Sequence, residues 1–320
     1  MNPKLLAGLI RDAYNQWNED KVPRLGAALA FYSLLSLAPL LLIAIGMAGL
    51  VFGAEAAQGQ LVGQLRELVG PEGADAIEAM IANARKPSSG TLATVIGLVT
   101  LLLGASGVFG QLQDALNTIW EVQPKPGLGV WGFLRGRFLS FSMVLGTGFL
   151  LLISLLLTTA LAAVGKWLGG LVPGWELVLQ VVDLAVTFGV VTLLFAMIFK
   201  YLPDAKVEWK DVWLGSVATS ALFMAGKFAI GVYLGRSGIG SSYGAAGSLV
   251  VLLVWIYYSA QILFFGAEFT QVYANRRGAK IDPSPNAESV GERSRIDQGI
   301  PHTERRKVSR STRTGRTSPR

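Results

Sequence analysis

Residues 25–54 read LGAALAFYSLLSLAPLLLIAIGMAGLVFGA, a stretch without a single charged side chain. A helix of about 20 apolar residues crosses the roughly 30 Å hydrocarbon core of a bilayer, so this stretch is long enough to span a membrane. Five later stretches are similarly apolar, and only two of them are interrupted by a charge, at Asp183 and at Lys227. The sequence therefore predicts an all-α, polytopic membrane protein with six transmembrane helices, which cover residues 25–53, 91–113, 138–165, 177–199, 212–235 and 240–267.

The composition agrees with this class. Charged residues make up 15% of the 320-residue chain, against about 25% in a typical soluble domain. The net charge of +7 comes from residues 275–320, which hold 12 Lys/Arg and 5 Asp/Glu. The basic character thus belongs to the tail, which argues against specific nucleic-acid binding. Cysteine is absent and the single histidine is His302, so disulfides and thiolate metal sites are excluded.

The distribution of Lys and Arg predicts the orientation. If the N-terminus is cytoplasmic, the first three cytoplasmic segments carry 10 Lys/Arg and the external segments carry 6. Loops that stay inside are enriched in these residues. We therefore expect both termini in the cytoplasm.

Three segments flank or connect the spans. Residues 1–24 contain an amphipathic helix, Pro3 to Asn18, which we expect on the cytoplasmic membrane surface; a soluble helix packed on the loops is the alternative. The external loop 55–90 is expected to form two short helices, broken at Gly70-Pro71. Residues 275–320 are basic and almost free of large apolar residues, so a disordered cytoplasmic tail is expected after the membrane domain 25–274.

Enzymatic chemistry finds no support. The stretch GLGVWG at 127–132 matches a dinucleotide-binding pattern, but that pattern works only between a strand and a helix, and here it joins two spans. Hydrolytic metal sites need clustered His, Asp or Glu ligands, and the acids of the membrane domain are scattered. We expect no catalytic residues, metal or cofactor.

Small residues and one proline shape the predicted helices. Pro39 lies midway along the first span and should kink it, because proline cannot donate to the carbonyl four residues earlier. Close helix packing in membranes uses small residues, although a glycine face can also act as a hinge or line a conduit. The glycines expected at helix contacts are Gly97, Gly104, Gly107, Gly110, Gly244 and Gly247.

Two groups of polar residues are candidate sites. Asp183 and Lys227 lie within the fourth and fifth spans at similar depths, so we expect them to pair or to line one cavity; the alternative is that Lys227 snorkels outward while Asp183 is hydrogen-bonded locally. A second group lies at inner span ends and is expected to form a polar cluster, with a solvated helix end as the alternative. Its members are Gln113, Asp114, Asn117, Trp120, Tyr201 and Glu268.

Several segments together resemble the YihY/BrkB family of bacterial inner-membrane proteins. They are AALAFYSLLSLAP at 27–39, LQDALNTIW at 112–120, YLP at 201–203, YGAAGS at 243–248, WIY at 255–257 and GAE at 266–268. The resemblance implies a six-helix, multi-pass protein of the bacterial plasma membrane without an agreed molecular activity. The family has carried a ribonuclease BN label and a virulence or serum-resistance label, and the missing metal-ligand cluster disfavours the ribonuclease.

The kinked first span, the glycine faces and the polar groups within spans favour a transporter-like or lipid-handling protein. A non-transporting scaffold or envelope-integrity protein is the alternative. The expected partners are membrane lipids, with anionic headgroups near the basic tail, and a solute or lipid substrate of unknown identity. A homo-oligomer is also compatible with the sequence.

Overall fold

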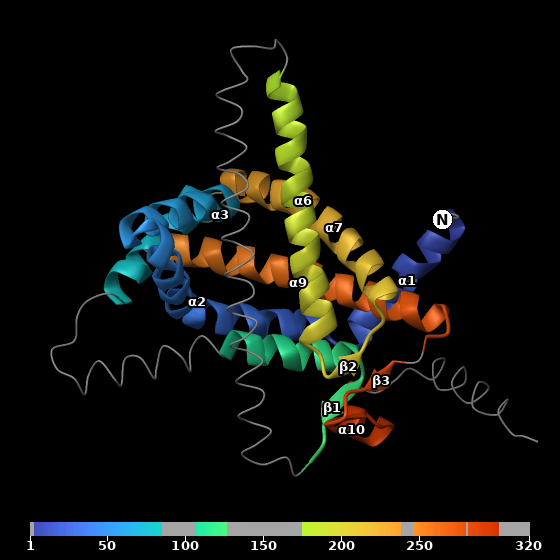
Figure 1. Ribbon diagram of the computed structural model, residues 1–320. Coiled ribbons are helices and arrows are strands. Elements are labelled where there is room, and N and C mark those ends of the chain that lie inside the picture. Colours follow the sequence, from blue (N-terminus) through green and yellow to red (C-terminus); the bar gives the residue numbers. More distant parts are fainter. Residues whose placement is uncertain (1–2, 85–106, 127–174, 238–245, 280, 301–320) are drawn as a thin grey trace, which may run out of the picture.

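The computed structural model describes residues 3–84, 107–126, 175–237, 246–279 and 281–300 (Figure 1). Helices dominate these segments, and residues 107–119 are helical as well. The helices are α1 (Pro3–Glu19), α2 (Val22–Phe52), α3 (Ala54–Ala84), α6 (Trp175–Tyr201), α7 (Trp209–Ser237), α9 (Gly247–Arg276) and α10 (Glu292–Asp297). The strands are β1 (Val122–Pro124), β2 (Ala205–Lys206), β3 (Asp282–Pro283) and β4 (Ala287–Ser289).

Three of the described helices are long and apolar enough to cross a membrane: Leu177–Tyr201, Trp209–Tyr233 and Gly247–Arg276. They match the fourth, fifth and sixth predicted spans. The third predicted span, residues 138–165, and most of the second lie outside the described residues.

The first predicted span is α2, and it is bent. Its segments Val22–Ala38 and Leu40–Gly46 meet at 46°, and together they count as a fourth candidate span. The bend falls at Pro39, where the helix lacks one backbone donor. The predicted kink is therefore present.

The loop after α2 also has the predicted break. Gly70 interrupts α3 with φ 80° and ψ 172°, and Pro71 follows it. A positive φ is accessible to glycine at no steric cost, so Gly70 separates two helical halves. The second half buries Ile77 and Ile81 against Ile45 of α2 and Leu252 of α9.

The main apolar core lies where four helices converge: the start of α2, residues 107–119, the end of α6 and the second half of α9. Leu25, Leu116, Ile119, Phe199 and Phe264 are among its buried members. Figure 1 shows these elements gathered beside the strands β1 and β2.

The expected disorder of the tail from residue 275 is wrong for residues 281–300. These residues form β3, β4 and α10, and they pair with loops between earlier helices. Strand β4 pairs antiparallel with β1, with Val122 opposite Ser289, and β3 pairs with β2, with Ala205 opposite Pro283. The segment needs no apolar core of its own, because the loops of the membrane domain pair with its strands and so provide hydrogen-bond partners for its backbone N–H and C=O groups. Residues 301–320 lie outside the described part of the chain.

Candidate functional site

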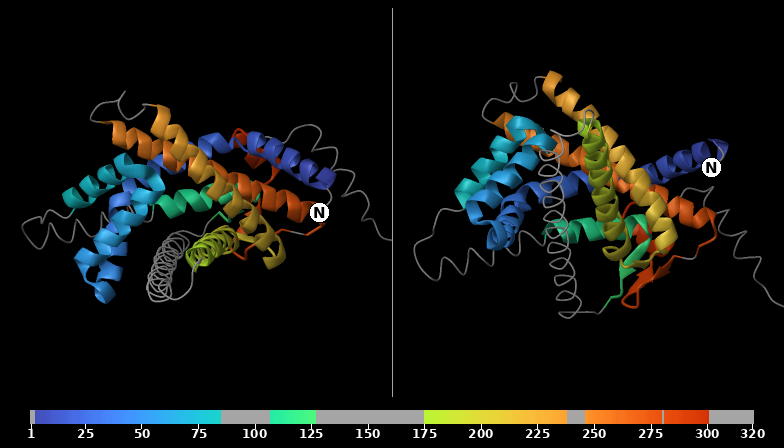
Figure 2. Two further views of the ribbon diagram at one scale, coloured as in Figure 1. Left: turned by 90° about the horizontal axis from the view of Figure 1, so that it is seen from above. Right: turned by 45° about the horizontal axis from the view of Figure 1, so that its top comes forward.

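Helix α1 has two different apolar faces. Leu9 and Ala13 are buried against Phe269 and Val272 of α9, and Asp12 pairs with Arg276. Figures 1 and 2 show α1 running beside the C-terminal half of α9. The second face remains open, with four large apolar side chains that are 40–55% exposed: Leu5, Leu6, Ile10 and Tyr14. An open stripe of this kind is typical of a helix that faces a bilayer.

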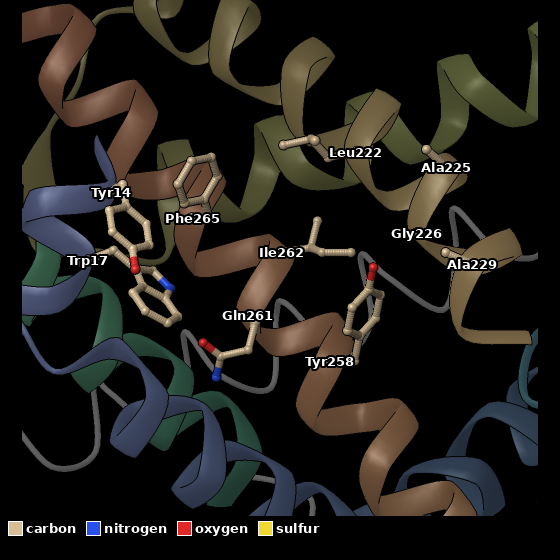
Figure 3. A pocket seen from close by; sticks show the side chains of 10 residues that line it. All are labelled: Tyr14, Trp17, Leu222, Ala225, Gly226, Ala229, Tyr258, Gln261, Ile262 and Phe265. Atoms are coloured by element: carbon tan, nitrogen blue, oxygen red, sulfur yellow. The ribbon is translucent and has the colours of Figure 1, made fainter. Parts of the chain in front are cut away.

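A groove of about 460 Å³ lies between α1, α7 and α9. In Figure 3 the rings of α1 stand on one side of α9 and the small residues of α7 on the other. The lining is formed by Tyr14, Trp17, Leu222, Ala225, Gly226, Ala229, Tyr258, Gln261, Ile262 and Phe265. None of these side chains is charged. The polar groups are two tyrosine hydroxyls, one indole N–H and the amide of Gln261.

Two glycine–threonine pairs set the spacing of α7 and α9. A Cβ at Gly215 would lie 1.7 Å from Thr270 Oγ1, and a Cβ at Gly266 would lie 1.9 Å from Thr219 Oγ1. Each threonine hydroxyl donates to the carbonyl four residues earlier on its own helix, over 2.7 Å in both cases. The two helices therefore touch through glycine backbone, and neither contact has room for a methyl group.

The glycines predicted at helix contacts fall into three groups. Gly107 packs against α2, since a Cβ there would lie 3.6 Å from the ring of Tyr32, and Gly247 is buried. A Cβ at Gly110 would meet nothing within 4 Å among the residues that the structure describes, so Gly110 makes no close contact with them. Gly97, Gly104 and Gly244 lie outside the described residues. The sequence reasoning did not single out Gly215 and Gly266, although each stands four residues before a threonine.

A polar cluster does form at the end of helix 107–119, and its centre is Asp204. Asn117 Nδ2 donates to Asp204 Oδ2 over 3.0 Å, while Asn117 Oδ1 accepts from the Asp204 backbone N–H over 2.7 Å. Gln113 Nε2 also donates to Asp204 Oδ2, over 3.2 Å. The cluster thus fixes the turn between α6 and β2 to helix 107–119.

The prediction named only part of this cluster. Gln113 and Asn117 belong to it, whereas Asp204 was missed although it directly follows the YLP stretch. Asp114 is exposed, and its carboxylate has no partner among the residues that the structure describes. Trp120 and Glu268 are buried in the interior, and exposed Tyr201 packs edge-on against Trp209. The structure does not bring these four residues to Asp204.

A second polar cluster centres on Arg295 of α10, which is 1% exposed. Arg295 Nη2 donates to Asp20 Oδ1 over 2.5 Å, and Nη1 lies 4.0 Å from Glu121 Oε1. Two non-glycine residues have positive φ in the described part of the chain, and both are here: Lys21 at 51° and Glu121 at 56°. Backbone of this kind persists only where surrounding contacts hold it. The Arg295 cluster therefore fixes the α1–α2 junction, the start of β1 and the C-terminal segment to one another.

The predicted pair of Asp183 and Lys227 does not form. Asp183 is exposed on the first half of α6 and Lys227 is half-buried on α7, and no ion pair joins them within the described chain. Neither residue lines the groove. The prediction considered only that Asp183 and Lys227 lie at similar depths in the membrane. It did not consider the direction in which each side chain points from its helix.

A comparison with protein families matches residues 13–290 of the chain to the model described as Virulence factor BrkB. The chain belongs to this family. The match begins within α1 and ends just after β4, so it includes the groove, the Asp204 cluster and the β1–β4 pair. The segments on which the sequence resemblance rests lie inside the same range.

Relatives of this BrkB-family chain are membrane proteins. It is 28% identical over 262 residues to a UPF0761 membrane protein of Halorhodospira halophila, covering 81% of this chain and 55% of the relative. It is 30% identical over 254 residues to a UPF0761 membrane protein of Pseudomonas aeruginosa, covering 78% and 58%. The chain thus spans little more than half the length of these relatives. No solved structure matches it.

Proposed function

We propose that this BrkB-family protein handles lipids, and that the groove between α1, α7 and α9 receives one lipid molecule. The observation that carries the proposal is the groove itself, an uncharged hollow of about 460 Å³ beside a helix with an open apolar stripe. Ligand pockets typically measure about 300–1,000 Å³ and combine apolar walls with a few polar groups.

The chemistry of the lining supports an amphipathic ligand. Tyr14 and Trp17 stack with ring centroids 5.8 Å apart at the α1 side of the groove. Such rings favour the headgroup level of a membrane, where one end is apolar and the other meets water. Leu222, Ala225 and Ala229 on α7 offer a smooth apolar wall suited to an acyl chain.

For a lipid groove beside α1, we propose that both termini lie in the cytoplasm of a bacterial cell and that α1 lies at the inner surface of the plasma membrane. The excess of Lys and Arg in the segments assigned to the cytoplasm carries this part of the proposal. Reporter fusions after Pro203 and at the C-terminus should read cytoplasmic, and a fusion at Gly73 external. A cytoplasmic reading at Gly73 would overturn the orientation.

A static scaffold is the second candidate, and the tight α7–α9 contact favours it. Helices that touch through glycine backbone do not separate easily, so transport would have to move α1 or the bent α2 instead. Flux separates the two candidates: a transporter or scramblase moves lipid when it is reconstituted alone, whereas a scaffold does not.

The test is lipid movement in proteoliposomes of phosphatidylethanolamine and phosphatidylglycerol, followed with a fluorescent phospholipid. Wild-type protein should accelerate exchange between leaflets. Ala225→Trp, which fills the groove, should abolish the acceleration, and Ala221→Trp should not, because Ala221 is exposed on the same helix but outside the lining. Equal rates with empty liposomes would refute the handling of this lipid and favour the scaffold.

A further inference from the structure

Three exposed aromatic rings lie together where α6 ends and α7 begins. Tyr201 is 54% exposed, Trp209 40% and Trp213 46%. The rings of Tyr201 and Trp209 meet edge-on with centroids 5.9 Å apart, and the rings of Trp209 and Trp213 lie 6.3 Å apart. Aromatic rings that combine an apolar body with a polar N–H or O–H are typical of surfaces that are apolar at one end and wet at the other. This aromatic patch therefore indicates an interaction surface.

The aromatic patch lies at the common end of two helices that are long and apolar enough to cross a membrane. One of these candidate spans ends at Tyr201 and the next one begins at Trp209. Figure 1 shows this end of α6 and α7 beside β2. Trp and Tyr are enriched where spans leave the hydrocarbon core and meet the headgroups. Both span ends thus place the patch at one surface of the membrane.

The exposed side chains of α7 change in character along this end of the helix. Glu208, just before the helix, is charged and exposed, and beyond Trp213 the exposed positions at the same helical spacing are Val217 and Ala221. Trp209 and Trp213 lie between these two parts, and four residues of helix extend over about 6 Å. The headgroup region on each side of a bilayer is about 5–8 Å thick. The order of side chains therefore matches a helix that passes from water through the headgroups into hydrocarbon.

A lysine accompanies the rings. Lys200 Nζ lies 5.6 Å from the centroid of the Trp209 ring and donates to the carbonyl of Val207. An ammonium group has three N–H donors, and Val207 accepts one of them. Two acids near this lysine in the sequence bind other groups: Asp204 accepts from two side-chain amides, and Asp211 pairs with an arginine. The patch therefore offers a cation that the ring and the carbonyl hold in place.

We propose that the aromatic patch lies in the headgroup layer of the membrane, and that Lys200 binds the phosphate of a phospholipid there. In the orientation proposed above this is the inner leaflet. The site shares no residue with the groove between α1, α7 and α9, so it stands whether or not the protein moves lipids.

The first experiment measures depth in the membrane. The chain contains no cysteine, so a single introduced cysteine carries the only spin label. The full chain is placed in nanodiscs of phosphatidylcholine and phosphatidylglycerol, and the label is tested for access to oxygen, which enters hydrocarbon, and to a nickel chelate, which stays in water. Labels at Glu208→Cys and at the control Arg293→Cys, on exposed α10, should favour nickel. Labels at Val217→Cys and Ala221→Cys should favour oxygen, most strongly at Ala221→Cys.

The second experiment tests the phosphate contact with phosphatidylglycerol that carries a photoactivatable headgroup. Wild-type protein should crosslink within residues 200–213. Lys200→Met should reduce this crosslink about fivefold, the ratio expected for one lysine at an anionic membrane surface, whereas Lys200→Arg should retain it. Lys125→Met is the matched control, because Lys125 also donates to a backbone carbonyl but lies outside the patch, and it should leave the yield unchanged. Inorganic phosphate should not compete, since the site requires a phosphate held at the level of the rings.

Each contrary result has a distinct meaning. Nickel access at Val217→Cys and Ala221→Cys would place the patch in water, and labels shielded from both reagents would indicate a protein partner instead of lipid; either result would overturn the proposal. A crosslink that Lys200→Met leaves at the wild-type yield, that Lys200→Arg reduces equally, or that inorganic phosphate competes away, would refute the phospholipid site at Lys200.

Discussion

The Arg295 cluster allows a quantitative prediction, because it is a buried charge network between segments far apart in the sequence. Arg295 and Asp20 are 275 residues apart, and their side chains are 1% and 2% exposed. Replacing Arg295 by Met removes the cation that pairs with the Asp20 carboxylate, which stays buried. Removing one member of a buried pair typically costs about 3–5 kcal/mol, chiefly because the remaining charge is uncompensated.

We therefore expect Arg295→Met to lower the free energy of unfolding by about 3–5 kcal/mol. The assay is denaturant unfolding of detergent-solubilised protein, followed by tryptophan fluorescence. Arg293→Met is the control, since Arg293 is exposed on the same short helix. Adding Asp20→Asn to Arg295→Met should recover much of the loss, because it neutralises the remaining charge.

Glu121 limits that recovery, since its carboxylate lies 4.0 Å from Arg295 and stays in the cluster. The reasoning would be refuted if Arg295→Met and Arg293→Met unfolded at the same denaturant concentration. It would also be refuted if the double variant were less stable than Arg295→Met alone.

Three further changes probe the rest of the structure by thermal unfolding in detergent. Gly215→Ala should destabilise the protein by about 1–3 kcal/mol through overpacking. Gly231→Ala is the control, because a Cβ there meets nothing within 4 Å among the described residues. Equal melting temperatures of the two variants would contradict the tight α7–α9 contact. Asn117→Ala should cost about 2 kcal/mol, because the Asp204 carboxylate and backbone N–H both lose a partner, and an unchanged melting temperature would count against the cluster. Truncation after Gly278 should also lower the melting temperature, since it removes both strand pairs together with Arg295. A truncated protein of full stability would support the tail that the sequence analysis expected to be disordered.

The membrane-spanning helices could be predicted because their main determinant is local. A run without charge, such as residues 25–54, identifies a span without knowledge of its neighbours. The backbone preferences of proline and glycine are equally local, so the bend at Pro39 and the break at Gly70 could also be predicted. Gln113 and Asn117 could be placed on one helical face from their spacing alone.

The partners across the fold could not be predicted, because they depend on which segments meet. Asp204 lies 87 residues from Asn117, and no pattern in the chain connects the two. The C-terminal segment was misjudged for a different reason. It contains few large apolar residues, yet it folds onto existing loops through strand pairing and one buried arginine. Neither interaction can be predicted from composition.

The direct test of the central claim is to identify what occupies the groove. The full chain should be purified in nanodiscs of native lipids, imaged by cryo-electron microscopy, and analysed by mass spectrometry of the lipid that remains after delipidation. We predict elongated density between α1, α7 and α9, and one retained lipid that Ala225→Trp displaces. A groove without density in the wild type, or a retained lipid that Ala225→Trp leaves in place, would contradict the lipid-binding role.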